Sequence, residues 1–445
     1  MILRISSLIL SGVLLTMTAF AGPTHEYHLK NGLTLIVRED HRAPVVLSSV
    51  WYKVGGSYEH DGITGISHML EHMMFKGTKK YKPGELNKIV SDNGGDQNAM
   101  TGEDYTVYYQ KWSKDKLPLS LMLEADRMKN LTLQQDLYNK EHQVVMEERR
   151  LRVDDNPQAV MVERYNAAAY VNSPYHHPVV GWMTDISHLT LADLSKWYHA
   201  WYAPNNAIVI IIGDVSPNKV FALTKKYFST IKKTQLPSIK PREEVAPLGS
   251  RFVYVHAVAK LPWLVVGFNT PSLKTVKKPW EAYALLVASG ILDSGTSSRL
   301  QKDLVRGKQI AVSASSSYNL YSKYSTDFSL TGVPTEKTSS TSLLNALEQE
   351  VVRLQSEPVS KKELERVKAQ VIANNVFEKD SLMNQLMNIG APEAVGLSWK
   401  SGDNFVQYVN AVTADQIQQV ARRYLTKDRM TVGELVPKEV ERGHR

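Results

Sequence analysis

Two histidines and one glutamate fall within the five residues His68-Met69-Leu70-Glu71-His72. If this run is helical, His68 and His72 lie one turn apart on one face, and Glu71 points between them. Two histidines at that spacing can hold one metal ion, and a carboxylate beside them that is not a ligand can take a proton from water. The run therefore indicates metal-assisted hydrolytic chemistry.

The same run also has a plainer interpretation. Its apolar neighbours form a stripe that can face a core, and that stripe alone would explain why a helix forms here. The stripe consists of Met69, Leu70, Met73, Met74 and Phe75. The histidines and the glutamate would then be the solvated edge of an amphipathic helix. The five residues by themselves leave both interpretations open.

A catalytic zinc site usually takes three protein ligands, so a further His, Glu or Asp is needed. The segment 141–150 (EHQVVMEERR) is predicted to be helical, and the helix should end before Pro157. Glu141 and Glu148 are seven positions apart on it and share a face. They could serve a metal site, or they could be surface carboxylates paired with the arginines that follow. Residue type and spacing do not decide between these two roles.

Two stretches together resemble the pitrilysin-type zinc peptidases, the inverzincin class with H-x-x-E-H order. The first is Gly55–Thr78 (GGSYEHDGITGISHMLEHMMFKGT) and the second is EHQVVMEERR. The family has its ligand glutamate about 76 positions after the second histidine, and 148 − 72 = 76 selects Glu148. Glu147 is the neighbouring competitor. Glu141 resembles a family carboxylate that lies outside the ligand shell and orients a ligand.

The resemblance implies one Zn²⁺ per chain, held by His68, His72 and Glu148. Glu71 would be the general base, and the activity would be hydrolysis of peptides or unfolded segments. The alternative is a non-catalytic peptide-binding or assembly subunit that keeps the metal helix for structure. Glu71 separates the two, because a structural site does not need a carboxylate that binds no metal.

A further matching stretch begins at Gly94-Gly95 and continues through Asn98 and Ala99 to a β-branched and aromatic run at 105–109. The glycines should end a helix, and the later run favours a strand. In the family, the equivalent strand lies at a sheet edge and pairs with substrate backbone, so Asn98 and Ala99 are candidate substrate contacts. The alternative is an ordinary hairpin strand in which Asn98 caps a turn.

The beginning of the sequence predicts export. A short basic start, an apolar run from Ile5 to Thr18 and the A-x-A site Ala19-Phe20-Ala21 fit a cleavable signal peptide over 1–21. The apolar run is too short for a confident membrane span. We therefore expect a periplasmic protein, with full secretion less favoured. Cysteine is absent, so any metal must be held by His and carboxylate.

The length that remains after the expected signal peptide at 1–21 suits two domains. A polar, proline-bearing stretch at 232–248 is the expected linker between domains at 22–231 and 249–445. The segments 190–215 and 413–436 repeat one order, a capped amphipathic helix followed by a strand. The resemblance implies an α+β fold of two homologous domains, each a mixed, mainly antiparallel sheet covered by helices, which together enclose a chamber. The zinc site would lie only in the first domain.

The formal net charge is +8, but Lys and Arg are scattered and no nucleic-acid motif accompanies them, so no nucleic-acid partner is expected.

The second half departs from the family at one place. Residues 297–314 resemble a segment in which an arginine and a tyrosine polarise the substrate carbonyl, and those positions are Val305 and Val312 here. Arg306 is one residue out of register, and Arg299 is expected to be structural. A homologous partner chain would have to supply the pair; a homodimer would not restore it.

Overall fold

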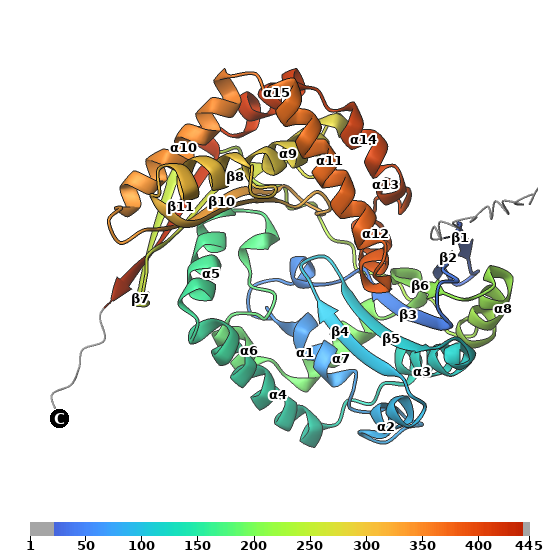
Figure 1. Cartoon of the computed structure of the whole chain (residues 1–445). Coiled ribbons are helices and arrows are strands. Elements are labelled where there is room, and N and C mark those ends of the chain that lie inside the picture. Colours follow the sequence, from blue (N-terminus) through green and yellow to red (C-terminus); the bar gives the residue numbers. More distant parts are fainter. Residues whose placement is uncertain (1–21, 439–445) are drawn as a thin grey trace, which may run out of the picture.

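The computed structural model describes residues 22–438. The expected signal peptide at 1–21 and the last residues, 439–445, lie outside this range. Within it, two β-sheets formed by successive halves of the chain are each covered by helices (Figure 1). No helix in the described range has the length and apolar character needed to cross a membrane.

The first sheet has six strands in the order β1-β2-β6-β3-β5-β4. Only the β2–β6 pair is parallel, and the other neighbours are antiparallel. The strands are β1 (Thr24–His28), β2 (Thr34–Glu39), β3 (Val45–Tyr52), β4 (Asp96–Thr101), β5 (Thr106–Ser113) and β6 (Ala207–Gly213). β6 is buried along its whole length, as its run of isoleucines and valine predicts for a central strand.

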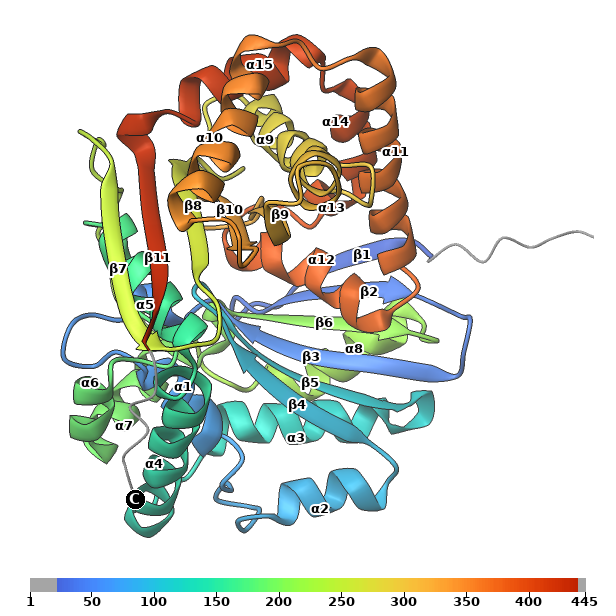
Figure 2. The ribbon, with the colours of Figure 1, turned by 60° about the vertical axis from the view of Figure 1, so that its left-hand side comes forward.

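Helices from the first half pack on one face of this sheet around a large apolar core. They are α1 (Ile66–Met73), α2 (Glu85–Asp92), α3 (Leu117–Asn130), α4 (Gln135–Arg149), α6 (Met183–His188), α7 (Leu191–Trp201) and α8 (Pro217–Phe228). Figure 2 shows α3 lying under the strands, with α1 and α4 at the end of the sheet where β4 and β5 are joined.

The second sheet has five strands in the order β7-β11-β8-β10-β9. They are β7 (Arg251–Val258), β8 (Trp263–Thr270), β9 (Ala311–Tyr318), β10 (Thr326–Pro334) and β11 (Met430–Lys438). Again one pair, β7–β11, is parallel. Its helices are α9 (Pro279–Leu292), α10 (Ser340–Ser356), α11 (Lys361–Glu378), α13 (Lys400–Asp403), α14 (Phe405–Ala411) and α15 (Ala414–Tyr424).

The repeat expected from the sequence is present in the structure. α7 leads to β6 and α15 leads to β11, and each of these strands lies between one parallel and one antiparallel neighbour. Both helices begin with a capping box, formed by Thr190 with Asp193 and by Thr413 with Gln416. The prediction of two homologous halves with mixed, mainly antiparallel sheets is therefore confirmed.

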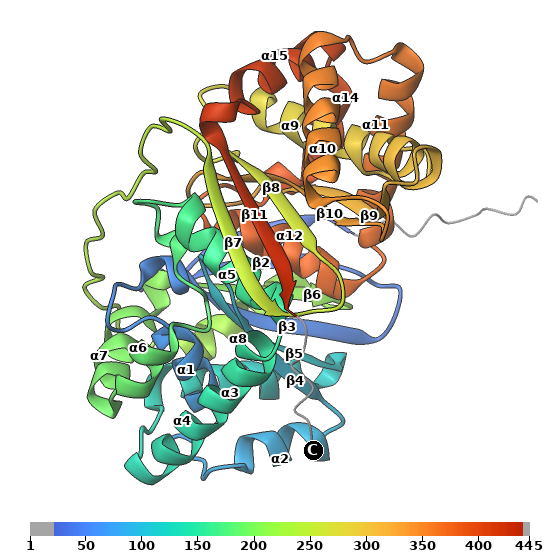
Figure 3. The same cartoon turned by 90° about the vertical axis from the view of Figure 1, so that its left-hand side faces the viewer.

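Each half also lends one helix to the other half's sheet (Figures 1 and 3). α12 (Leu382–Ala394) places Leu386 and Ile389 against the free face of the first sheet, beside Trp51. α5 (Pro157–Ala169) places Met161 and Tyr165 against the second sheet. This exchange was not predicted from the sequence. Residues 232–248, where the linker was expected, contain no helix or strand.

Candidate active site

The helix that carries His68 and His72 begins at a tightly constrained turn. Gly65, at its N-cap, has φ +85°, and a Cβ there would overlap the carbonyl of Val180, so only glycine fits. The buried carboxylate of Glu59 accepts hydrogen bonds from the amides of Gly65 (2.7 Å) and Ser67 (2.8 Å). These contacts satisfy backbone donors that the helix itself leaves unpaired, and they fix where α1 starts.

The apolar stripe of α1 is buried, as the sequence predicted. Met69, Leu70 and Met73 lie in the core of the first half. Burial of that stripe turns His68 and His72 towards α4, which packs beside α1. The stripe thus explains why the helix forms, and it also directs the two histidines at one neighbouring element. The histidines are not a solvated edge, because His68 is buried and the side chain of His72 is only 19% exposed.

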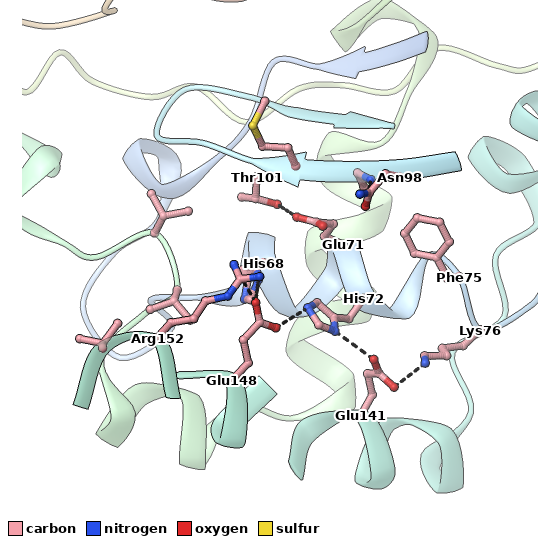
Figure 4. Close-up of a pocket in the computed structure, with 15 residues that line it drawn as sticks. His68, Glu71, His72, Phe75, Lys76, Asn98, Thr101, Glu141, Glu148 and Arg152 are labelled. Carbon is pink, nitrogen blue, oxygen red and sulfur yellow. Dashed lines mark hydrogen bonds and ion pairs between the residues drawn. The ribbon is translucent and has the colours of Figure 1, made fainter. Parts of the chain in front are cut away.

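Three ligand-type side chains meet between α1 and α4 (Figure 4). Glu148 lies with Oε2 3.2 Å from Nε2 of His72 and with Oε1 3.8 Å from Nε2 of His68. One ligand atom from each of the three residues lies within 4.8 Å of the others. Ligand atoms of a tetrahedral zinc site are roughly 3.4 Å apart, given bonds of about 2.0–2.2 Å. The donor set therefore fits a zinc ion in both chemistry and spacing.

Glu147, the competing neighbour, faces away from this cluster. It forms an ion pair with Arg150 at 2.9 Å, and its side chain is 58% exposed, against 18% for Glu148. Glu141 lies behind His72 and its carboxylate is 2.9 Å from Nδ1 of that ring. Lys76 holds the other oxygen of Glu141 at 2.5 Å. A carboxylate on Nδ1 leaves Nε2 of His72 directed at the metal position.

The electrostatics of the two histidines differ. Burial lowers the pKa of His68 to about 3, helped by the charges of His72 and Arg152, so this ring is neutral at physiological pH. Burial alone would lower the pKa of His72, but the Glu141 hydrogen bond and the charge of Glu148 raise it overall. A metal ion must therefore compete with a proton at His72 and not at His68.

Glu71 projects to the other side of the cluster, away from Glu148. Its Oε2 accepts a hydrogen bond of 2.5 Å from the hydroxyl of Thr101, at the end of β4. Burial raises the pKa of Glu71, which makes the carboxylate a stronger base. Thr101 was not singled out from the sequence, although it closes the Gly94–Thr101 stretch that was.

β4 forms the opposite wall of the site and is an edge strand, which within residues 22–438 pairs only with β5. Asn98 and Ala99 lie in the middle of it and border the cavity. Asn98 does not cap a turn; its side-chain oxygen accepts from the amide of Ala99 at 2.8 Å. The edge is available for addition of an extended peptide, and the role of these two residues in substrate contact stays a prediction.

The cavity has a volume of about 640 Å³, and all the residues that line it come from the first half of the chain. Arg152 also lines the cavity, although in the sequence it was only one of the arginines that follow Glu148. It stands on a single π-helical turn, Arg150–Asp154, and binds Oε1 of Glu148 at 2.9 Å. Its guanidinium is thus another positive charge close to the cluster.

The structure gives the location of the two second-half positions that were expected to lack hydrogen-bond donors. Val305 is in the π-helical segment Leu300–Gly307, and Val312 is on β9 with an exposed side chain. Arg306 donates to the carbonyl of Thr296. Arg299 makes two hydrogen bonds of 2.9 Å to Glu363, which confirms that it is structural.

A second group of metal-ligand type joins Asp61 with His176 and His177. His176 is 2.6 Å from the carbonyl of Ser173, and His177 is 2.8 Å from Asp61, so both make ordinary loop contacts. The group lies outside the cavity lined by Glu71.

A duplicated fold with an H-x-x-E-H helix facing a glutamate on a second helix is typical of the inverzincin peptidases. Comparison with known families agrees. Residues 34–181 match the family described as "Insulinase (Peptidase family M16)", and residues 188–371 match the "Peptidase M16 inactive domain". The chain therefore belongs to peptidase family M16.

Individual relatives extend this result. The zinc protease PqqE of Helicobacter pylori is 40% identical over 301 residues, which span 66% of each chain. The "Uncharacterized zinc protease YmxG" of Bacillus subtilis is 25% identical over 90% of this chain and 96% of its own. The crystal structure of a protease from Helicobacter pylori is similar at a TM-score of 0.87 and 32% identity, covering 94% of this chain and 100% of that one.

Proposed function

We propose that this chain is a zinc-dependent endopeptidase for peptides or unfolded segments, and that it is the zinc-bearing subunit of a two-chain enzyme. The observation that carries the proposal is the cluster of His68, His72 and Glu148, with Glu71 beside it but turned away from Glu148. Membership of the M16 family, with relatives named zinc proteases, supports it.

His68, His72 and Glu148 would hold the ion, one per chain. When bound, zinc supplies a Lewis acid that polarises a peptide carbonyl and makes water more acidic. Glu141 holds Nδ1 of His72, so that Nε2 stays directed at the ion.

Glu71 takes the proton from the attacking water and later passes it to the nitrogen of the leaving amine. Thr101 keeps the carboxylate of Glu71 in place through its hydroxyl. The substrate would lie as an added strand along β4, with Asn98 and Ala99 in contact with its backbone. The edge strand borders the same cavity as Glu71, so an added peptide is delivered to the base.

The two-chain part of the proposal rests on Val305 and Val312. Neither side chain can donate a hydrogen bond to a carbonyl oxygen, and every described residue that borders the cavity belongs to the first half. A homologous chain with the arginine and tyrosine would complete the site. We further propose a zinc-bearing domain at 22–231, a linker at 232–248 and a metal-free domain at 249–445, in a protein exported to the periplasm.

A non-catalytic subunit is the second candidate, because the second half matches a domain described as inactive. Reversible removal of the metal tests whether the chain is an endopeptidase or a non-catalytic subunit. Chelation should abolish cleavage of a quenched peptide library by the chain with its partner, and added Zn²⁺ should restore it. Cleavage that survives complete removal of the metal would overturn the proposal. An absence of cleavage in the fully loaded two-chain complex would favour the non-catalytic subunit.

A further inference from the structure

A second cavity, of about 430 Å³, lies between the two halves of the molecule. The first half contributes Glu103, Tyr170 and Tyr175 to its wall, and the second half contributes Tyr321 and Asn388. Its lining is therefore aromatic and polar, with carboxylates as the charged groups. A cavity at a domain interface with convergent polar groups is a common place for a ligand.

Three residues that line this cavity each have one polar atom that is buried without a hydrogen-bond partner among the described residues. These atoms are Oε2 of Glu103, the hydroxyl of Tyr321 and Nδ2 of Asn388. The adjacent Asp104, by contrast, accepts from the hydroxyls of Ser57 (2.7 Å) and Tyr175 (2.6 Å). The carboxylate of Asp104 is thus hydrogen-bonded, whereas Oε2 of the neighbouring Glu103 has no hydrogen-bond partner among the described residues.

The surroundings of Glu103 favour the protonated carboxyl unless a cation is brought beside it. Burial raises the pKa of this carboxyl, and the negative charges of Asp104 and Glu59 raise it further. Lys323 is near Asp104, but its ammonium lies 3.5 Å from the ring centre of Tyr58 and is not bonded to Glu103. A buried carboxylate is costly unless it is paired, and tyrosine rings stabilise a cation through their faces.

This cavity adjoins the catalytic one. Glu103 follows Thr101, which holds Glu71, by only two residues. Gly56 forms part of the boundary: a Cβ there would lie 3.1 Å from Oε2 of Glu103 and 3.6 Å from Val179. Val179 in turn borders the catalytic cavity. Gly56 and Val179 therefore stand between Oε2 of Glu103 and the catalytic cavity.

We propose that the interdomain cavity is a substrate subsite for a positively charged group of the peptide, either a lysine or arginine side chain or a free amino terminus. Glu103 receives the charge, and the tyrosines form the wall around it. This inference rests on the proposed peptidase function, since it concerns the substrate of that site. The zinc site itself does not set this preference for a positively charged group.

Binding measured without turnover tests the subsite. The zinc-loaded Glu71→Gln chain is titrated, by fluorescence anisotropy, with short blocked peptides in which one lysine moves position by position. Each peptide has a twin with norleucine in place of lysine, and a further pair compares free with acetylated amino termini. The same titrations are made with Glu103→Gln added, and with Glu365→Gln added as a control on the exposed face of α11.

The best lysine peptide or the free-amine peptide should bind about 10-fold or more tightly than its neutral twin, as a charge-assisted hydrogen bond requires. Glu103→Gln should reduce that ratio to near one, while Glu365→Gln leaves it unchanged. A response of the lysine and norleucine pair identifies a side chain as the source of the charge, and a response of the free and acetylated pair identifies the amino terminus. Glu103→Asp, which keeps the charge on a shorter side chain, should retain part of the preference.

An unchanged ratio in Glu103→Gln, or no charge preference at any position, would overturn the subsite. So would an absence of measurable binding by every peptide. Failure of the peptidase proposal looks different: the parent chain with its partner would cleave nothing, while the charge preference in binding and its dependence on Glu103 would remain.

Discussion

Two adjacent glutamates on α4 have opposite surroundings. Glu148 faces His68 and His72, whereas Glu147 points outward and pairs with Arg150. The difference follows from the 100° step between neighbours on a helix, which allows only one of the two to reach the cluster. The pair therefore provides a matched test of the ligand assignment.

Glu148→Gln should reduce zinc content far below one per chain, because a neutral amide is a poor ligand and two histidines alone hold the ion weakly. Glu147→Gln should keep zinc at the parent level. Metal analysis of the two purified variants after dialysis checks this. Loss of zinc from Glu147→Gln with retention by Glu148→Gln would show that the assignment is off by one residue.

At the scale of elements, the exchanged helices depend on glycines that permit close contact. On α12, a Cβ at Gly390 would overlap the indole of Trp51, which is fully buried on β3. On β8, a Cβ at Gly267 would overlap the hydroxyl of Tyr165 from α5. Each sheet thus accepts a helix from the other half at a position without a side chain.

Gly390→Ala should destabilise the protein by about 1–3 kcal/mol, because the methyl group must displace a rigid buried ring. The better helix propensity of alanine, worth about 1 kcal/mol, only partly offsets this. Thermal unfolding of the variant checks the sign. Adding Trp51→Leu should relieve the overlap, so the double variant should lose less than the sum of the single losses. Strict additivity would contradict the proposed contact.

The docking of α5 should also respond to pH through Asp327, which accepts a hydrogen bond from Tyr165. Burial raises the pKa of Asp327 from 3.8 to about 6, against the opposing effects of Tyr165 and Arg251. A raised carboxyl pKa means that the folded state holds the proton more tightly. Its contribution to stability is full below pH 3.8 and is lost as the pH rises through about 6.

Asp327→Asn cannot ionise, so its melting temperature relative to the parent should improve as the pH rises from about 4 to about 7. Parallel melting curves of the two proteins across that range provide the measurement. A difference that stays constant, or one that shifts in favour of the parent at higher pH, would show that Asp327 is not the titrating group.

Local patterns were sufficient to predict the elements that carry the metal cluster. The spacing of His68 and His72 predicted α1, and the two capping boxes marked the repeated helix and strand. Contacts between distant segments were not predictable in this way. Thr101 reaches Glu71 only because β4 packs over α1, and the helix exchange leaves no periodic signal in either half.

At the scale of the whole molecule, the first half bears all three proposed zinc ligands, while the second half has Val305 and Val312 at the expected donor positions. Donors to a developing oxyanion are typically worth about 10²–10³ in rate. A chain that lacks them should be a poor peptidase by itself, even when it is fully loaded with zinc.

A homologous chain with the arginine and tyrosine should raise peptide cleavage by about 10²-fold or more and form a heterodimer on size exclusion. Substituting that arginine and tyrosine in the partner, with the heterodimer intact, should remove the gain. Full activity from the rigorously purified single chain would contradict the two-chain proposal and leave the zinc cluster unaffected.

The assignment of Glu71 as the base is tested most directly by one paired measurement on Glu71→Gln and the parent, each with its partner. Zinc content and the rate of peptide cleavage are determined on the same samples. Glutamine is nearly isosteric with glutamate, and Glu71 is outside the proposed ligand set, so zinc should stay at the parent level while the rate falls by about 10²–10⁴-fold. A variant that keeps both its zinc and its rate would contradict the assignment.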